Sequence, residues 1–346
     1  MANPQAQNPS ITVLGAGQMG LVCAALLTGS DRDPRESPPN VRIWGHDLDE
    51  VGHLAQTRAS ERLPGFRLPE TVRPVINDAE ALEGADLIVS AIPAQHTRQA
   101  WERLAPHVPA GAGAISVAKG VETRTLMTPT RVILEVAEGD RPAAVLSGPT
   151  IATELARCLP ATMIAASADN AFSQTVQRLF STSWLRVYTN ADVLGVELAG
   201  ATKNVIAIAA GILDGLGAGN NAKSALLARG LAEIARLGSS LGAQTDTFFG
   251  IAGVGDLATT CFSPEGRNRS CGEALGKGVP LKTYLEESPM VVEGVETTRA
   301  VVDLAQTAGV DMPITHAVHD VLFEGLDPIE AISSLMSREL RAERVG

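Results

Sequence analysis

One lysine stands in the middle of a long apolar stretch, residues 195–213, with the sequence GVELAGATKNVIAIAAGIL. Its apolar residues spread all around a helix, which is typical of a helix buried in a core. Burial there disfavours the charged form of Lys203 unless the ammonium finds partners or loses its proton. Its helical neighbours Ala199, Gly200 and Ala207 are small, so a ligand could lie beside it. Two interpretations stay open: a side chain that reaches the surface along its stem, and a lysine that binds a ligand or exchanges a proton.

A glycine-rich loop near the start of the chain could bind a dinucleotide. The sequence GAGQMG, residues 15–20, follows a short β-type run and precedes an apolar helical stretch. In a strand, loop and helix of this kind, glycines allow backbone N–H groups to approach a pyrophosphate at the helix N-terminus. We therefore expect Gly15, Gly17 and Gly20 to contact a dinucleotide.

The next expected strand, residues 41–44, ends where dinucleotide-binding folds distinguish their cofactors. An acid there favours the ribose hydroxyls of NAD, and a cation accommodates the 2′-phosphate of NADP. The sequence Gly45-His46-Asp47 carries both signals. His46 could face the adenosine, and Asp47 could bind the ribose or cap the next helix. The preference between the two cofactors stays open, and the Pro-rich residues 29–40 before the strand are expected to form an exposed loop.

Further candidate residues lie at the end of a strand expected at residues 113–120 and directly after one expected at residues 143–146. Lys119 would lie at the carboxyl edge of a parallel sheet, where open α/β folds bind ligands, although a solvated loop lysine is the alternative. The turn SGPT, residues 147–150, could line a site with its N–H groups and hydroxyls. A helix is expected over residues 123–136.

From residue 190 onward the pattern is helical, so we expect a domain boundary near there. Residues 250–257, GIAGVGDL, should form a tight turn rather than a phosphate loop, because no strand precedes them. Arg267 and Arg269 lie close together and could hold a phosphate through paired N–H groups. A pair of surface arginines is the alternative.

Composition limits the classes of protein. A chain of 346 residues is long enough for two domains, and its net charge of −11 without a basic run argues against nucleic acid as a partner. The four cysteines form no CxxC pair, so we expect free thiols in a reducing cytoplasm. The first ten residues do not read as a signal peptide, and no apolar run reads as a membrane span. No metal site is expected.

Taken together, these segments resemble the bacterial NAD(P)-dependent sn-glycerol-3-phosphate dehydrogenases. The resemblance runs from residue 11 to about residue 337, and GATKNVIAIAAG together with GRNR is its most specific part. The matching segments occur in the family's order: GAGQMG, VRIWGHD, AKGVE, SGPTIATE, GATKNVIAIAAG, ARGLAEIARLG, GVGDL, GRNRSCG, VVEGVET and MPIT.

The resemblance implies an α/β fold of the 6-phosphogluconate-dehydrogenase-like kind. An N-terminal Rossmann-like parallel-sheet domain, residues 1–190, would bind NAD or NADP, and an all-α domain, residues 191–346, would carry the substrate and catalytic groups. The implied reaction is reversible reduction of dihydroxyacetone phosphate to sn-glycerol 3-phosphate, which supplies phospholipid synthesis. A cytoplasmic enzyme is expected, and a homodimer on general grounds.

The resemblance also implies roles for single residues, with Lys203 as the general acid/base. The implied substrate contacts are Lys119, Gly148, Thr150, Lys203, Asp256, Arg267 and Asn268. The implied cofactor contacts are Gly15, Gly17, Gln18, Met19, Gly20, His46, Lys119, Ala152, Arg267, Val291 and Glu293. Burial should lower the pKa of Lys203, and Asp256 could orient it or bind a substrate hydroxyl.

Gln18-Met19 stand where the family usually has Ser or Ala and an aromatic residue, and Gly266 replaces a frequent serine. Two rival functions share this architecture: a dehydrogenase of hydroxyacids or sugar acids, and a sensor that binds NAD(P) without catalysis.

Overall fold

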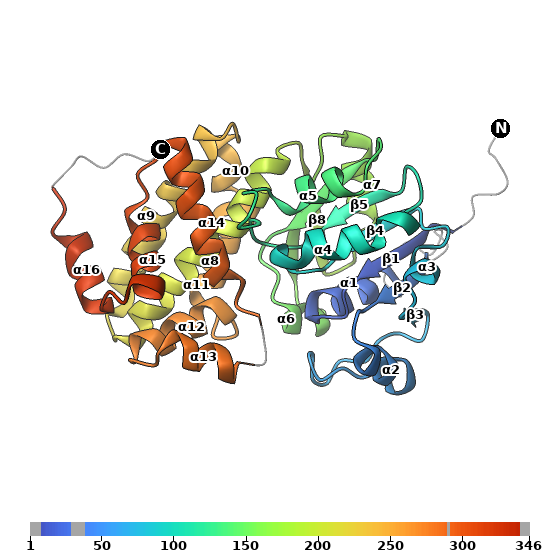
Figure 1. Ribbon diagram of the computed structural model, residues 1–346, viewed down its shortest axis with the longest axis horizontal. Coiled ribbons are helices and arrows are strands. Elements are labelled where there is room, and N and C mark those ends of the chain that lie inside the picture. The colour runs from blue at the N-terminus through green and yellow to red at the C-terminus, as the bar shows by residue number, and fades with distance from the viewer. Residues whose placement is uncertain (1–7, 29–38, 289–290, 340–346) are drawn as a thin grey trace. The chain divides into compact units, whose positions relative to one another are not determined.

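The computed structural model describes residues 8–28, 39–288 and 291–339 (Figure 1). The chain divides into two compact units. The first unit comprises residues 1–118, 130–146 and 150–191, and the second comprises residues 119–129, 147–149 and 192–346. Residues 29–38 of the expected loop lie outside the described residues, as do residues 340–346.

The first unit contains an eight-stranded sheet. Its strands are β1 (Ser10–Leu14), β2 (Asn40–Trp44), β3 (Val72–Val75), β4 (Leu87–Ser90), β5 (Gly113–Ser116), β6 (Ala143–Ser147), β7 (Ala161–Ala166) and β8 (Leu185–Asn190). They lie in the order β3-β2-β1-β4-β5-β6-β7-β8. Parallel pairs join β3 to β2, β2 to β1, β1 to β4, β4 to β5, β5 to β6 and β7 to β8. The strand order reverses at β1, which is where open sheets of this kind bind their ligands.

Helices cover both faces of this sheet. They are α1 (Gln18–Thr28), α2 (Leu48–Thr57), α3 (Asp78–Leu82), α4 (Ala94–Leu104), α5 (Pro129–Val136), α6 (Ala152–Ala156) and α7 (Asn170–Phe180), with a 3₁₀ turn at Ala105–His107. Successive strand residues point to opposite faces. Val13 packs in a cluster with residues of α1 and α7, whereas Leu14 packs in a second cluster with residues of α3, α4 and α5. Burial on both faces explains why most of these strands are continuous apolar runs.

Two elements predicted in this part of the chain, a helix and a strand, have wrong boundaries. The helix expected over residues 123–136 begins only at Pro129, because residues 122–127 form a closed turn in which Leu126 N–H donates to the Glu122 carbonyl and Leu126 has a φ of +58°. The strand expected to reach residue 120 ends at Ser116. Strand β3 was not expected, since it contains a proline, which a strand at the edge of a sheet tolerates.

In the described residues after Asn190, the second unit is helical. Its helices are α8 (Val193–Gly215), α9 (Gly219–Ser240), α10 (Thr245–Phe249), α11 (Asp256–Phe262), α12 (Arg267–Gly276), α13 (Leu281–Glu287), α14 (Glu293–Ala308), α15 (Pro313–His319) and α16 (Pro328–Met336), with π-helical turns at Ile251–Gly255 and Asp320–Glu324. Helix α8 confirms the predicted buried helix around Lys203. It is long and apolar enough to cross a membrane, but 89% of its most apolar window is buried inside the protein, as in a core helix.

Residues 250–257 do not form the expected tight turn. The π-helical turn Ile251–Gly255 leads directly into α11. A Cβ at Gly253 would lie 2.0 Å from the carbonyl oxygen of Phe248, so only glycine allows this close approach. The π-helical turn makes Asp256 the first residue of α11, and such turns are frequent at functional sites.

Helices α8 and α12 approach each other closely at glycines. A Cβ at Gly272 would lie 2.0 Å from the carbonyl oxygen of Ile208, and a Cβ at Gly211 would lie 1.9 Å from that of Arg269. No side chain fits between the two backbones at these points. The contact fixes the position of α12 against the helix that carries Lys203.

We expect Gly272→Ala to lower the free energy of unfolding by about 1–3 kcal/mol, because the added methyl group must push two backbones apart. Urea unfolding measures this change. Gly52→Ala in α2 is the matched control, since its Cβ would meet nothing within 4 Å. An unchanged stability of Gly272→Ala would contradict the close contact between α8 and α12.

Candidate active site

The glycine-rich loop of the first unit has a geometry that suits a dinucleotide. Gly15 has a φ of +109°, and a Cβ at Gly20 would lie 1.9 Å from the carbonyl oxygen of Gly15. A Cβ at Gly17 would enter open space. Because α1 begins at Gln18, a helix N-terminus adjoins this space, and such a terminus attracts a pyrophosphate. The residues of the loop therefore fit NAD(P).

The end of β2 adjoins the same loop, since the Gly15 N–H donates to the Trp44 carbonyl over 2.8 Å. Asp47 caps α2, and its carboxylate accepts hydrogen bonds from two backbone N–H groups of the first turn, each over 3.0 Å. These bonds lower the pKa of the Asp47 carboxyl. Of the two roles left open for Asp47, the structure shows the helix cap. His46 is exposed next to it.

Lys203 and Asp256 form a buried ion pair in the second unit. Lys203 Nζ lies 2.6 Å from Asp256 Oδ1 and also donates to the hydroxyl of Thr260, one turn further along α11. Lys203 is 6% exposed and Asp256 is 1% exposed. The ammonium therefore stays inside the unit, and the interpretation of Lys203 as a lysine that reaches the surface is wrong.

A second lysine binds the same carboxylate. Lys119 Nζ lies 2.7 Å from Asp256 Oδ2 and donates to the Gly148 carbonyl over 2.8 Å. The Lys119 carbonyl accepts a hydrogen bond of 3.0 Å from the side chain of Asn204, the residue after Lys203. Lys119 is thus part of the cluster rather than a solvated loop lysine.

Burial lowers the pKa of Lys203 from its ordinary value of 10.5 to about 8. The charge of Lys119 acts in the same direction, and Asp256 opposes both. The predicted direction of the shift is confirmed. A lysine whose pKa lies close to the working pH can both donate and accept a proton.

The role expected for one small neighbour of Lys203 is wrong. A Cβ at Gly200 would lie 3.2 Å from Ser147 Oγ and 3.5 Å from Lys119 Cγ. Gly200 therefore makes room for the stem of Lys119 and for Ser147 rather than for a ligand.

Two members of the cluster, Thr260 and Asn204, were not predicted. Thr260 follows Asp256 by four residues, and this spacing places both on one face of a helix. The helical spacing of these two residues was not recognised, because residues 250–257 were expected to form a tight turn. Asn204 directly follows Lys203, and its contact with the Lys119 carbonyl joins positions 85 residues apart, which no local pattern indicates.

A second group of predicted residues lies where α12 and α14 begin. Arg267 and Asn268 open α12, and Val291 and Glu293 lie at the start of α14. Arg267 Nη1 donates to the Val291 carbonyl over 3.3 Å, and Asn268 Oδ1 accepts the Gly294 N–H over 2.9 Å. Arg267 is exposed, so its guanidinium is accessible to an anion.

Gly294 links this group to the lysine cluster. A Cβ at Gly294 would lie 2.6 Å from Asn268 Oδ1 and 3.0 Å from the carbonyl oxygen of Asn204. Asn268 therefore lies beside the turn of α8 that carries Lys203.

Arg269 has a structural role instead of the expected phosphate contact. Its guanidinium lies 2.7 Å from a carboxylate oxygen of Asp214 on α8 and 3.2 Å from one of Glu273. The interpretation of Arg267 and Arg269 as a phosphate-binding pair is therefore wrong, and Arg267 is the remaining candidate.

Other predicted cofactor contacts belong to the first unit. Gln18 Nε2 donates to the Arg62 carbonyl over 2.7 Å, and Met19 packs against the core of the sheet. Met19 is thus partly buried at the edge of this core. Thr150 and Ala152 also belong to this unit, with Ala152 as the first residue of α6.

The chain matches two family models over most of its length. Residues 10–173 match the N-terminal part of NAD-dependent glycerol-3-phosphate dehydrogenase, and residues 192–333 match its C-terminal part. The chain belongs to the NAD-dependent glycerol-3-phosphate dehydrogenase family.

Individual relatives of the chain are also glycerol-3-phosphate dehydrogenases. The chain is 43% identical to a glycerol-3-phosphate dehydrogenase [NAD(P)+] of Nitratidesulfovibrio vulgaris and 44% identical to one of Chlorobium limicola, in each case over 96% of this chain and 99% of the relative. The crystal structure of a glycerol-3-phosphate dehydrogenase from Coxiella burnetii has a TM-score of 0.90 at 36% identity and covers 96% of this chain and 99% of that one. The predicted fold class, enzyme class and NAD(P) cofactor of this dehydrogenase are confirmed.

More distant structures share the fold alone. A ketopantoate reductase from Ralstonia eutropha has a TM-score of 0.60 at 15% identity.

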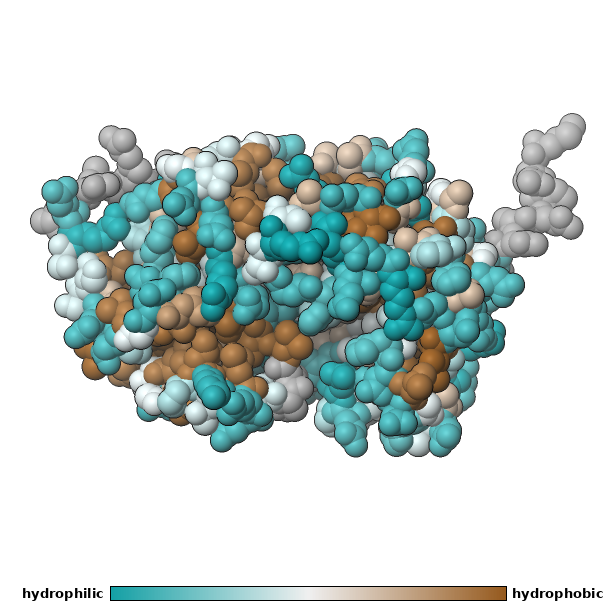
Figure 2. Space-filling view, in the orientation of Figure 1, coloured by the Kyte–Doolittle hydropathy of each residue, from teal (hydrophilic) through white to brown (hydrophobic). Residues whose placement is uncertain are grey.

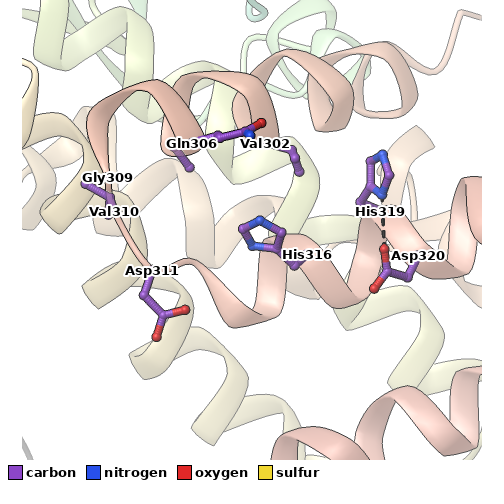
Figure 3. A pocket seen from close by; sticks show the side chains of 9 residues that line it. Val302, Gln306, Gly309, Val310, Asp311, His316, His319 and Asp320 are labelled. Carbon is purple, nitrogen blue, oxygen red and sulfur yellow. Dashed lines mark hydrogen bonds and ion pairs between the residues drawn. The ribbon is translucent and has the colours of Figure 1, made fainter.

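The second unit also has a cavity of about 580 Å³, wide open to the surface, that contains none of the predicted site residues (Figure 3). It lies between α14 and α15, and His319 Nδ1 lies 3.1 Å from Asp320 Oδ1 at its edge. The cavity is lined by Val302, Ala305, Gln306, Gly309, Val310, Asp311, His316, His319 and Asp320.

The described residues contain no group of three or more His, Cys, Asp or Glu side chains that could hold a metal ion.

Proposed function

We propose that this chain reversibly reduces dihydroxyacetone phosphate to sn-glycerol 3-phosphate with NAD(P)H and thereby supplies phospholipid synthesis. The observation that carries the proposal is the buried Lys203, which shares the carboxylate of Asp256 with Lys119. A sensor that only binds NAD(P) needs no such cluster.

The test follows NADH or NADPH absorbance after addition of dihydroxyacetone phosphate, with unphosphorylated dihydroxyacetone as the matched substrate. Oxidation with the phosphorylated substrate alone supports the proposal. Oxidation with hydroxyacid precursors instead would favour the rival dehydrogenase, and no oxidation with either cofactor would favour the sensor.

In the proposed mechanism, bound NAD(P)H supplies the hydride that reduces carbon C2 of the substrate. Lys203 Nζ donates a proton to the carbonyl oxygen, which becomes the C2 hydroxyl, and accepts it again in the reverse reaction. Lys119 adds positive charge that stabilises the developing oxyanion. Asp256 holds both ammonium groups in place through its two carboxylate oxygens.

The phosphate of the substrate, away from the reacting carbon, would bind to the residues at the start of α12. Arg267 and Asn268 would hold the phosphate, and this contact positions the carbonyl at Lys203. The proposed substrate contacts are Lys119, Gly148, Thr150, Lys203, Asp256, Arg267 and Asn268. The proposed cofactor contacts are Gly15, Gly17, Gln18, Met19, Gly20, His46, Lys119, Ala152, Arg267, Val291 and Glu293.

The two directions of the reaction should depend on pH in opposite ways. Reduction needs protonated Lys203, whose pKa is lowered to about 8, so kcat/KM for dihydroxyacetone phosphate should fall as the pH rises through 8. Oxidation of sn-glycerol 3-phosphate needs the neutral amine, so its kcat/KM should rise over the same range. Initial rates between about pH 6 and pH 10, which is about two pH units on either side of that pKa, measure the pH profiles of both directions. Parallel profiles in the two directions would argue against Lys203 as the proton donor.

We expect Arg267→Ala to raise KM for dihydroxyacetone phosphate about tenfold or more, as the loss of a charge-assisted hydrogen bond implies. Arg299→Ala is the control, because this arginine is also exposed on the second unit but lies over the ring of Phe323. An unchanged KM in Arg267→Ala would place the phosphate elsewhere.

We also propose that residues 1–190 act as the cofactor domain and residues 191–346 as the substrate domain, although residues 119–129 and 147–149 of the first range belong to the second compact unit. Free cysteines support a cytoplasmic location, because they persist in a reducing compartment.

A homodimer is supported by exposed apolar side chains of the second unit, among them Phe249, Phe262, Ile329 and Met336. Figure 2 shows a broad apolar area on that unit. Light scattering of the purified chain tests the dimer.

A further inference from the structure

At the end of β2, the acid that could favour NAD in a dinucleotide-binding fold is engaged by the N-terminus of α2. Gly45 has no side chain, and a Cβ there would lie 2.6 Å from Val51 Cγ2. The first acid after it, Asp47, uses Oδ1 to cap α2. Among residues 45–47, the acid that could recognise the free hydroxyls of NAD is therefore already engaged as a helix cap through one of its two carboxylate oxygens.

An arginine from a more distant loop reaches the same place. An antiparallel bridge between Ala59 and Arg67 closes this loop, and Arg62 lies within it. The Arg62 carbonyl accepts a hydrogen bond of 2.7 Å from Gln18, the first residue of α1. Arg62 is therefore tied to the glycine-rich loop, which we assign to the dinucleotide.

The guanidinium of Arg62 lies beside the start of α2. It binds both carboxylate oxygens of Glu50, with Nη2 3.0 Å from Oε2 and Nε in contact with Oε1. Glu50 lies in the first turn of α2, three residues after Asp47. The Arg62 side chain is 48% exposed, and this pair uses two of its five N–H groups.

We propose that Arg62 binds the 2′-phosphate of the cofactor and that Glu50 competes with this phosphate for the guanidinium. The site would take an adenosine ribose that carries a 2′-phosphate, so it sets the preference for NADPH over NADH. The inference rests on the proposed dinucleotide site and deepens it. Arginine suits the role because its planar guanidinium can bind phosphate through two N–H groups at once.

The test uses two adenosine fragments that do not require turnover. Isothermal titration calorimetry measures the binding of 2′,5′-ADP and of 5′-AMP to the full chain and to its variants. In Arg62→Gln, we expect the affinity for 2′,5′-ADP to fall about tenfold or more and that for 5′-AMP to stay within about twofold. In Glu50→Gln, we expect the affinity for 2′,5′-ADP to rise about two- to fivefold, since a competing surface ion pair is lost.

Arg73→Gln is the matched control, because Arg73 forms a similar exposed ion pair, with Glu80, elsewhere in the first unit. We expect it to change neither affinity. The ratio of kcat/KM for NADPH to that for NADH should fall in Arg62→Gln in parallel with the calorimetry.

The outcomes separate the two proposals. If the unmodified chain binds both fragments but Arg62→Gln keeps their affinity ratio, Arg62 does not recognise the 2′-phosphate and the inference is overturned. If the unmodified chain binds neither fragment and oxidises neither cofactor, the dinucleotide site itself is overturned, and the inference with it.

Discussion

We expect Lys203→Arg to lower kcat for reduction of dihydroxyacetone phosphate by about 100-fold or more, the usual scale for loss of a general acid. Arginine keeps the positive charge beside Asp256, so the buried carboxylate retains a partner. The pKa of arginine lies far above the working pH, so its guanidinium cannot donate a proton to the substrate at a useful rate. Stopped-flow oxidation of NADPH or NADH measures the change. Lys203→Ala should lose as much activity, with cofactor binding nearly intact.

Lys223→Arg is the matched control for this variant. Lys223 is also a buried lysine of the second unit, and it pairs with Asp214 rather than with Asp256. We expect its kcat to stay within about threefold of the original, since it touches neither reacting group. Normal turnover of Lys203→Arg would remove Lys203 from the mechanism.

Asp256→Asn should be the variant with the largest loss of stability. The carboxylate accepts ion pairs from both Lys203 and Lys119, and its removal leaves two ammonium groups without their counter-charge. Breaking a buried ion pair by removing one partner costs about 3–5 kcal/mol, and here the pKa of Lys203 would fall further as well. Thermal unfolding measures the first effect, and the pH dependence of reduction measures the second, as a shift of the profile to lower pH.

Asp214→Asn provides the comparison, because Asp214 also bridges two cations, Lys223 and Arg269. It is more exposed than Asp256, so we expect a smaller loss of stability and an unshifted pH profile. An unshifted profile in Asp256→Asn would show that Asp256 supports the fold without tuning Lys203.

Elements with a strong local pattern could be predicted from the sequence. Helix α8 is apolar around its whole circumference over six turns (roughly, at 3.6 residues per turn), and strand β1 with its glycine loop follows a spacing that backbone geometry requires. Elements with weak patterns were missed or misplaced. Strand β3 has a proline at an edge position, and the π-helical turn before Asp256 has three glycines, which resemble a tight turn when only the sequence is read.

The sequence by itself determined the family, the dinucleotide loop and the buried helix around Lys203, because each depends on residue types at short spacings. Only the tertiary structure decided which charges meet. Asp256 lies 53 residues from Lys203 and 137 residues from Lys119, yet it binds both. Arg269 pairs with Asp214 while its near neighbour Arg267 stays exposed, and Asp47 caps a helix. Ion pairs of this kind depend on where helices begin and which faces they bury, and no short stretch of sequence contains that information.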